Sequence, residues 1–265
     1  MGVASQFPPL PPLVPEDYQW KQSPADPSVW RRRAIGTENV VGLQPSNKSG
    51  EYDLFLSCTA QLHSDGPTVT GLEQAIQKAC LRIRSQHPEI AHTVLWDEAG
   101  STWIQAHVTN DQAQLDAWAR SVVIVETSNR SAADICNAIE EQRQMNSPVD
   151  AKSVTIYVVA PVESRESALV DTTVQFLFHV NHLYFDGMSI RRLAGDFFHT
   201  LGTQLLAGSN DENPALNSGP ENLSPPVLDV LDRGQEISGS LFETHRAKYM
   251  ETTMQGMVRI NPPSW

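Results

Sequence analysis

Apolar residues recur along two long segments of the chain with the spacing of an amphipathic helix. The first segment runs from Gly71 to Gln86 and ends before Pro88; its apolar residues are Leu72, Ala75, Ile76, Ala79, Cys80 and Ile83. The second follows Gly187 and reaches Gly208, with Ile190, Leu193, Phe197, Leu201 and Leu205. A shorter helix is predicted from Ser131 to about Met145, because Ser131 and Asp134 have the spacing of an acidic capping box.

Runs rich in β-branched and aromatic residues predict strands before and between these helices. The runs are 52–62, 93–96, 102–108, 122–126, 154–159 and 171–180, and the last is the strongest. Strands mixed with helices that cover one face favour an α/β (α+β) domain, built as a two-layer sandwich with a mixed sheet.

The remaining segments show less periodicity. Residues 1–50 are predicted to be an irregular lead-in, with Arg31, Arg32 and Arg33 as a solvated surface feature, and residues 51–207 to be the folded lobe. Gly, Ser, Asn and Pro dominate residues 208–226, which predicts a linker before a helix around Ile237 to Met257.

Charge and cysteine content argue against several classes of protein function. The formal net charge of −12 argues against a nucleic-acid or anionic-membrane binder, although a local basic patch could still hold an anionic cofactor. No stretch approaches the ~18 consecutive apolar residues of a membrane span. The three cysteines have no zinc-ligand spacing, so neither a metal site nor a disulfide framework is expected. The N-terminus lacks the features of a targeting segment, and a cytoplasmic location is therefore expected.

One short segment carries candidate chemistry. His182-Leu183-Tyr184-Phe185-Asp186-Gly187 follows the apolar run 171–180 and precedes the second long helix. Histidine is suited to general-base catalysis at the pH at which enzymes work. A glycine after Asp186 permits a positive φ and the close approach of a ligand, and a buried carboxylate is expected beside the imidazole. Asn181 and Tyr184 flank His182 and are candidates for substrate contact. The alternative is a core histidine followed by an Asp-Gly turn.

At these residues the chain resembles the superfamily of chloramphenicol acetyltransferase, BAHD acyltransferases and peptide-synthetase condensation domains, which share the motif HxxxDG. Gln86-His87-Pro88-Glu89-Ile90, between a helix and a strand, is similar to a passage of the superfamily's N-terminal lobe. The style of the chain looks closest to fungal trichothecene O-acetyltransferases.

The resemblance implies an acyltransferase that moves an acyl group from acyl-CoA (acetyl-CoA) to a hydroxyl of a small secondary metabolite. The acyl-CoA is a co-substrate, and no permanently bound cofactor is implied. His182 would be the general base. Asp186 would be structural and form a salt bridge, and Gly187 would leave room for substrate.

The chain departs from the superfamily in its C-terminal part. Superfamily members have about two lobes with the active site between them, and no DFGWG-like segment occurs here. Residues 227–265 would be only a crossover helix and the tail of an incomplete second lobe. The alternatives are therefore a truncated or repurposed single lobe that binds a ligand, and a site completed by a second chain or by further copies of the same chain. A hydrolase that uses His182 with water is a third possibility.

Overall fold

The computed structural model describes residues 15–34, 38, 53–63, 66–96, 102–144, 152–207 and 219–224. The chain divides into two units, Met1–Ser224 and Pro225–Trp265, and every described residue belongs to the first. The helix predicted around Ile237 to Met257 lies outside the described residues.

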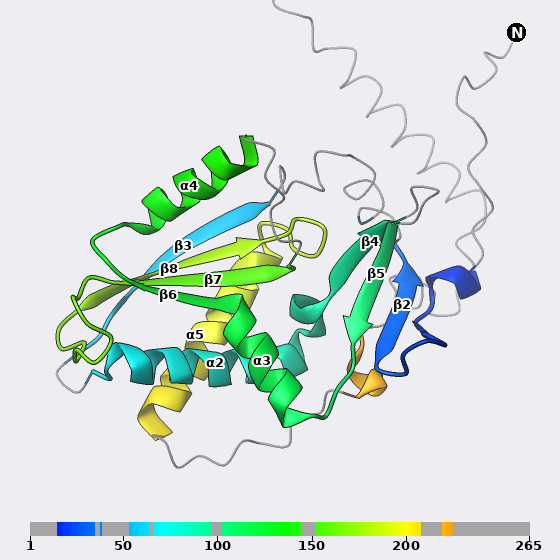
Figure 1. Ribbon diagram of the computed structural model, residues 1–265, viewed down its shortest axis with the longest axis horizontal. Coiled ribbons are helices and arrows are strands. Elements are labelled where there is room, and N and C mark those ends of the chain that lie inside the picture. Colours follow the sequence, from blue (N-terminus) through cyan, green and yellow to red (C-terminus); the bar gives the residue numbers. More distant parts are fainter. Residues whose placement is uncertain are drawn as a thin grey trace, which may run out of the picture. The chain divides into compact units, whose positions relative to one another are not determined.

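The larger of two sheets has the strand order β3-β8-β7-β6 (Figure 1). Its strands are β3 (Leu54–Gln61), β6 (Val123–Thr127), β7 (Val154–Ala160) and β8 (Thr173–Val180). β8 pairs antiparallel with β3 and β7, whereas β6 and β7 are parallel, so the sheet is mixed as predicted. Each strand lies within a few residues of its predicted position.

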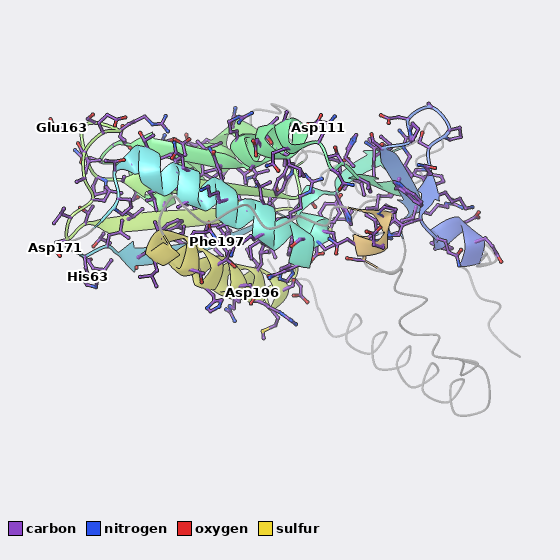
Figure 2. All side chains as sticks on the ribbon, turned by 90° about the horizontal axis from the view of Figure 1, so that it is seen from below. His63, Asp111, Glu163, Asp171, Asp196 and Phe197 are labelled. Carbon is purple, nitrogen blue, oxygen red and sulfur yellow. The ribbon has the colours of Figure 1, made fainter. Side chains whose placement is uncertain are left out.

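β8 lies at the centre of the core because residues on both of its faces are buried. Phe176 and Phe178 belong to the same apolar cluster as residues of α2 (Val69–Gln86) and α5 (Ser189–Ala207). Phe197 of α5 packs edge-on against both rings, with centroid distances of 6.2 Å to Phe176 and 5.3 Å to Phe178. Figure 2, in which Phe197 is labelled, shows α2 and α5 side by side on this face. Both helices occupy the predicted segments.

The other face of the larger sheet is covered by α4 (Ala132–Gln144) (Figure 1). Ile135 and Ile139 of α4 pack with Val159 of β7 and Leu177 of β8. The α/β class is confirmed, and helices cover both faces of this sheet, because the second face of its strands is also apolar. As predicted, a reciprocal capping box begins α4, in which Asp134 Oδ2 accepts from the Ser131 backbone at 2.7 Å.

The smaller sheet is antiparallel and has the order β1-β2-β5-β4. Its strands are β1 (Lys21–Gln22), β2 (Val29–Arg33), β4 (Thr93–Trp96) and β5 (Thr102–His107). The β4–β5 pair was predicted, but β2 lies in a segment predicted to be irregular. The prediction that the whole arginine run is solvated is wrong for Arg32, which is 6% exposed. Its guanidinium pairs with Glu38 at 2.6 Å and lies 5.1 Å from the Trp20 ring centroid.

The helix α3 (Gln112–Val122) was not predicted. Its signals are nevertheless present in the sequence: Asp111 caps the helix by accepting from the Ala113 amide at 2.9 Å, and Leu115, Ala119 and Val122 are buried at helical spacing. Short 3₁₀ helices span η1 (Pro15–Tyr18), η3 (Pro88–Ala91) and η5 (Pro220–Asn222).

Part of the predicted linker packs against the first unit. Asn222 Nδ2 donates to the Ser85 carbonyl at 3.0 Å, and Trp20 Nε1 donates to the Ser224 carbonyl at 2.9 Å. Residues 219–224 are therefore held at the C-terminal end of α2. Among the described helices, none is long and apolar enough to cross a membrane.

Candidate active site

The chain leaves β8 through a tight turn that Asn181 organises. The Asn181 amide donates to the Ser153 carbonyl at 3.0 Å, which continues the pairing of β8 with β7. Its side-chain Oδ1 accepts from the Leu183 amide at 2.9 Å, and its carbonyl accepts from the Tyr184 amide at 3.1 Å. Asn181 is buried, so its amide group serves the turn itself. Its contact with substrate stays a prediction.

His182 is partly exposed, like Tyr184, whereas Asn181, Leu183 and Phe185 of the same turn are buried. Leu183 is buried against the smaller sheet, and Phe185 is buried in the main core. Leu183 and Phe185 therefore fix the backbone that follows His182, and the buried Asn181 fixes the backbone that precedes it. Within the described residues the imidazole makes no hydrogen bond or ion pair, so its nitrogens are available to a ligand. His182 therefore lies on a loop held by a rigid scaffold, a usual location of catalytic residues, and its role as a general base stays a prediction.

Asp186 begins α5. Its Oδ1 accepts hydrogen bonds from the Met188 amide at 3.0 Å, the Ser189 amide at 2.7 Å and the Ser189 hydroxyl at 2.8 Å. The Ser189 hydroxyl accepts in turn from the Asp186 amide at 2.7 Å. These bonds, first of all the one from the Ser189 amide, lower the pKa of Asp186, with a smaller contribution from His182. The carboxylate is therefore a helix cap, the position at which a negative charge favours a helix.

The sequence-based expectation of a buried carboxylate beside His182 is wrong, because Asp186 is exposed. Within the described residues Asp186 forms no salt bridge. The backbone at Gly187 does not adopt a positive φ either, so the turn itself does not require glycine. A Cβ added at Gly187 would meet no described atom within 4 Å. Glycine adds no side chain to the space that the described residues leave beside the turn, and room for a substrate there stays a prediction.

Tyr184 points from the same turn into a second cluster of buried polar side chains. Its ring lies edge-on to His92, with 6.1 Å between centroids, and Trp20 lies 5.1 Å from the other side of His92. Neither Tyr184 Oη nor His92 Nε2 has a hydrogen-bond partner within the described residues, and both atoms are buried. Burial raises the pKa of Tyr184 well above 10 and lowers the pKa of His92 to about 3. Both groups are therefore neutral at physiological pH.

His179, three residues before His182, serves the larger sheet. Its Nε2 lies 2.6 Å from Asp53 Oδ2, and its ring stacks on Phe55 with 4.7 Å between centroids. His179 is buried on the face that α4 covers. In the described part of the chain, no group of three or more His, Cys, Asp or Glu residues could hold a metal ion.

Comparison with known proteins places this arrangement in a family. The profile of the family described as "15-O-acetyltransferase Tri3" matches residues 10–262. The chain belongs to this family. The expected resemblance to fungal trichothecene O-acetyltransferases is thereby confirmed.

Relatives of the Tri3 family agree with this assignment. The chain is 38% identical over 260 residues to a trichothecene O-acetyltransferase TRI3 of Trichoderma arundinaceum, covering 94% of this chain and 50% of the relative. It is 32% identical over 255 residues to a trichothecene 15-O-acetyltransferase TRI3 of Fusarium sporotrichioides, covering 93% and 49%. The solved structure of the TRI3 trichothecene 15-O-acetyltransferase from Fusarium sporotrichioides matches with a TM-score of 0.76 at 30% identity, over 91% of this chain and 48% of that one. The chain therefore spans about half the length of the relatives that it matches.

Proposed function

We propose that this protein transfers an acetyl group from acetyl-coenzyme A to a hydroxyl of a small secondary metabolite of the trichothecene type, with His182 as the general base. Membership in the Tri3 family and the names of its relatives support the reaction class and the acceptor. The observation that carries the role of His182 is its position: a half-exposed imidazole, without an internal hydrogen bond in the described residues, on a turn anchored by its neighbours.

The chemistry assigned to His182 follows the needs of acyl transfer. An imidazole nitrogen takes the proton of the acceptor hydroxyl while its oxygen attacks the thioester carbonyl carbon. The carbon–sulfur bond then breaks, and the proton passes from the imidazolium to the leaving thiolate. Asp186 acts through structure, because its cap on α5 fixes the end of the turn that holds the histidine.

The test is a transfer assay with the purified protein, acetyl-coenzyme A and a trichothecene alcohol, in which thiol release and the acetylated product are both measured. His182→Ala is expected to lower the rate by roughly 100-fold or more, the usual contribution of a general base. His199→Ala, which removes an exposed histidine from α5, is the matched control and should keep the rate. Equal rates for the His182→Ala variant and the unaltered protein would refute the role of His182. Thiol release without an acceptor would indicate a hydrolase instead.

A second candidate is a single lobe that needs a partner chain or that binds a ligand without independent transferase activity. The exposure of Asp186, Gly187 and Met188 beside the turn favours it. The mass of the protein in solution distinguishes the cases. A stable trimer or heterodimer that transfers acetyl supports a shared site, whereas a monomer that releases no thiol supports the ligand-binding role.

A further inference from the structure

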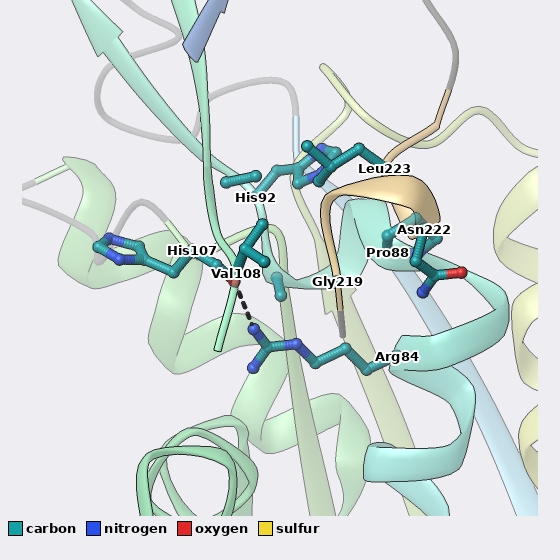
Figure 3. Close-up of a pocket in the computed structure, with 10 residues that line it drawn as sticks. Arg84, Pro88, His92, His107, Val108, Gly219, Asn222 and Leu223 are labelled. Carbon is teal, nitrogen blue, oxygen red and sulfur yellow. Dashed lines mark hydrogen bonds between the residues drawn. The ribbon is translucent and has the colours of Figure 1, made fainter. Parts of the chain in front are cut away.

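Arg84, in the last turn of α2, is a buried cation. Its side chain is 7% exposed. The Nη2 group donates to the His107 carbonyl at 2.8 Å (Figure 3), and the guanidinium carbon lies 4.7 Å from the centroid of the Trp118 ring. Burial lowers the pKa of Arg84 to about 10, so the group remains charged at neutral pH.

The described residues provide no carboxylate for this charge. No Asp or Glu among them forms an ion pair with Arg84, and its Nε and Nη1 groups make no hydrogen bond to a described residue. Buried charges in proteins are normally paired, because an isolated charge loses its hydration without compensation. One carbonyl and one aromatic face satisfy only part of the guanidinium, and its remaining donors are available to an anionic ligand at the wall of a cavity.

Arg84 lines a cavity of about 400 Å³, a volume within the range of small-molecule sites. The wall also contains Lys152, Trp118, Ile90 and Val122, so it combines positive charge with apolar surface. Lys152 Nζ donates to the Ser121 carbonyl at 2.9 Å, which holds it at this wall. No Asp or Glu of the described residues lines the cavity, although acidic residues outnumber basic ones by 31 to 19 in the chain.

The cavity is separate from the candidate active site. None of residues 182–187 lines it. Its wall at Ser153 reaches the turn only through the backbone, because the Ser153 carbonyl accepts the hydrogen bond of the Asn181 amide. At His92 the wall also meets the Tyr184 ring, with 6.1 Å between the centroids, so a ligand in the cavity would lie beside the His182 turn with its own set of contacts.

We infer that this cavity binds a small molecule that carries a carboxylate or phosphate group on a flat apolar body. The anionic group pairs with Arg84 and Lys152, and the apolar body packs against Ile90, Val122 and the Trp118 indole. A guanidinium suits both anions, since its planar donors match the oxygens of a carboxylate or a phosphate. His92, which also lines the cavity, is neutral at physiological pH and adds no charge of its own.

The test uses benzoate and phenyl phosphate as probes and benzamide as the neutral analogue of benzoate. Thermal unfolding and titration calorimetry of the 265-residue protein measure binding, because a ligand specific for the folded state raises the unfolding temperature with its concentration. We expect a saturable rise with at least one anion and none with benzamide. A response to benzoate alone assigns a carboxylate ligand, and a response to phenyl phosphate alone assigns a phosphate.

Two variants and a matched control separate this site from general charge effects. Lys152→Gln is expected to weaken anion binding roughly tenfold, the loss of one charge-assisted hydrogen bond, and Arg84→Gln to abolish it. Arg120→Gln removes the same charge from an exposed position on α3 and should leave binding unchanged. If Arg84→Gln does not fold, the effect of Lys152→Gln on anion binding still tests the inference. The inference is overturned if neither anion binds saturably, if benzamide binds as well as benzoate, or if Arg120→Gln weakens binding as much as Lys152→Gln.

Discussion

His92 makes the stability of this protein depend on pH in a direction that can be worked out from its surroundings. Its side chain is 3% exposed and lies between Trp20 and Tyr184. Burial, with a further contribution from Arg32, lowers its pKa from 6.5 to about 3. The folded state binds the proton less readily than the unfolded state. The contribution of neutral His92 to the free energy of unfolding is therefore fully present above pH 6.5. It is lost progressively as the pH falls toward 3.

The expected loss is about 1.4 kcal/mol for each pH unit below the unfolded-state pKa, or roughly 3 kcal/mol at pH 4.5. Urea unfolding monitored by circular dichroism at pH 4.5 to 8 measures the free energy of unfolding. His92→Phe removes the titrating group and keeps an apolar ring. We therefore expect the free energy of the unaltered protein, minus that of the variant, to be constant above pH 7 and to fall below pH 6. A constant difference down to pH 4.5 would show that His92 accepts a proton freely in the folded state and would refute the reasoning.

His87 supplies an internal control of opposite sign. Its Nε2 lies 2.9 Å from Asp196 Oδ2, labelled in Figure 2, and its Nδ1 lies 3.3 Å from Glu89. The hydrogen bond to Glu89, followed by that to Asp196 and opposed by burial, raises the pKa of His87 above 6.5. The stabilisation that protonated His87 gives to the folded state is fully present below pH 6.5. It is lost as the pH rises through the folded-state pKa. His87→Gln should therefore destabilise the protein more at pH 6 than at pH 8.

Substitutions at three further positions test the scaffold. Gly66→Ala should lower the free energy of unfolding by about 1–3 kcal/mol in urea, because its Cβ would lie 2.1 Å from the Leu169 carbonyl oxygen; an unchanged midpoint would contradict this contact. Phe178→Ala should cost about 3–5 kcal/mol in the same assay, since the ring is fully buried and packs edge-on against Phe197 and Phe198; a loss comparable to that of an exposed residue would place it outside the core. Asp186→Ala should lower both the unfolding temperature and the transfer rate. Asp186→Asn can still cap α5 and should recover much of both. A transfer rate that Asp186→Asn does not recover would argue for a direct role of the carboxylate.

The elements predicted correctly are those whose pattern is local. α2, α4, α5 and the strands of the larger sheet follow from apolar spacing and from caps such as Ser131 with Asp134. α3 shows the limit of this approach. Leu115, Ala119 and Val122 have helical spacing, but the helix is short, and Leu81, which packs with Leu115 and Ala119, lies on α2. β2 was missed for a related reason, because its pairing with β5 joins segments about 74 positions apart.

Some features of the candidate site could likewise be predicted from the sequence, and others could not. The position of His182 after a buried strand was readable from the sequence, and so was the structural role of Asp186 by resemblance. The sequence also contains the reason for that role, since Ser189 stands three residues after Asp186 as the partner in a reciprocal cap. The exposure of Asp186 was not readable, because it depends on which other segments cover the turn.

The sequence by itself determined the periodic helices, the apolar strands, the family motif and the turn that presents His182, since each depends on residues within a few positions of one another. The tertiary structure alone decided that Arg32 is buried against Trp20, that His92 is neutral beneath Tyr184, and that Arg84 enters a cavity lined without a described carboxylate. The physical reason is that burial and charge pairing depend on the distance between side chains in space, and segments far apart in the sequence set those distances only when the chain folds.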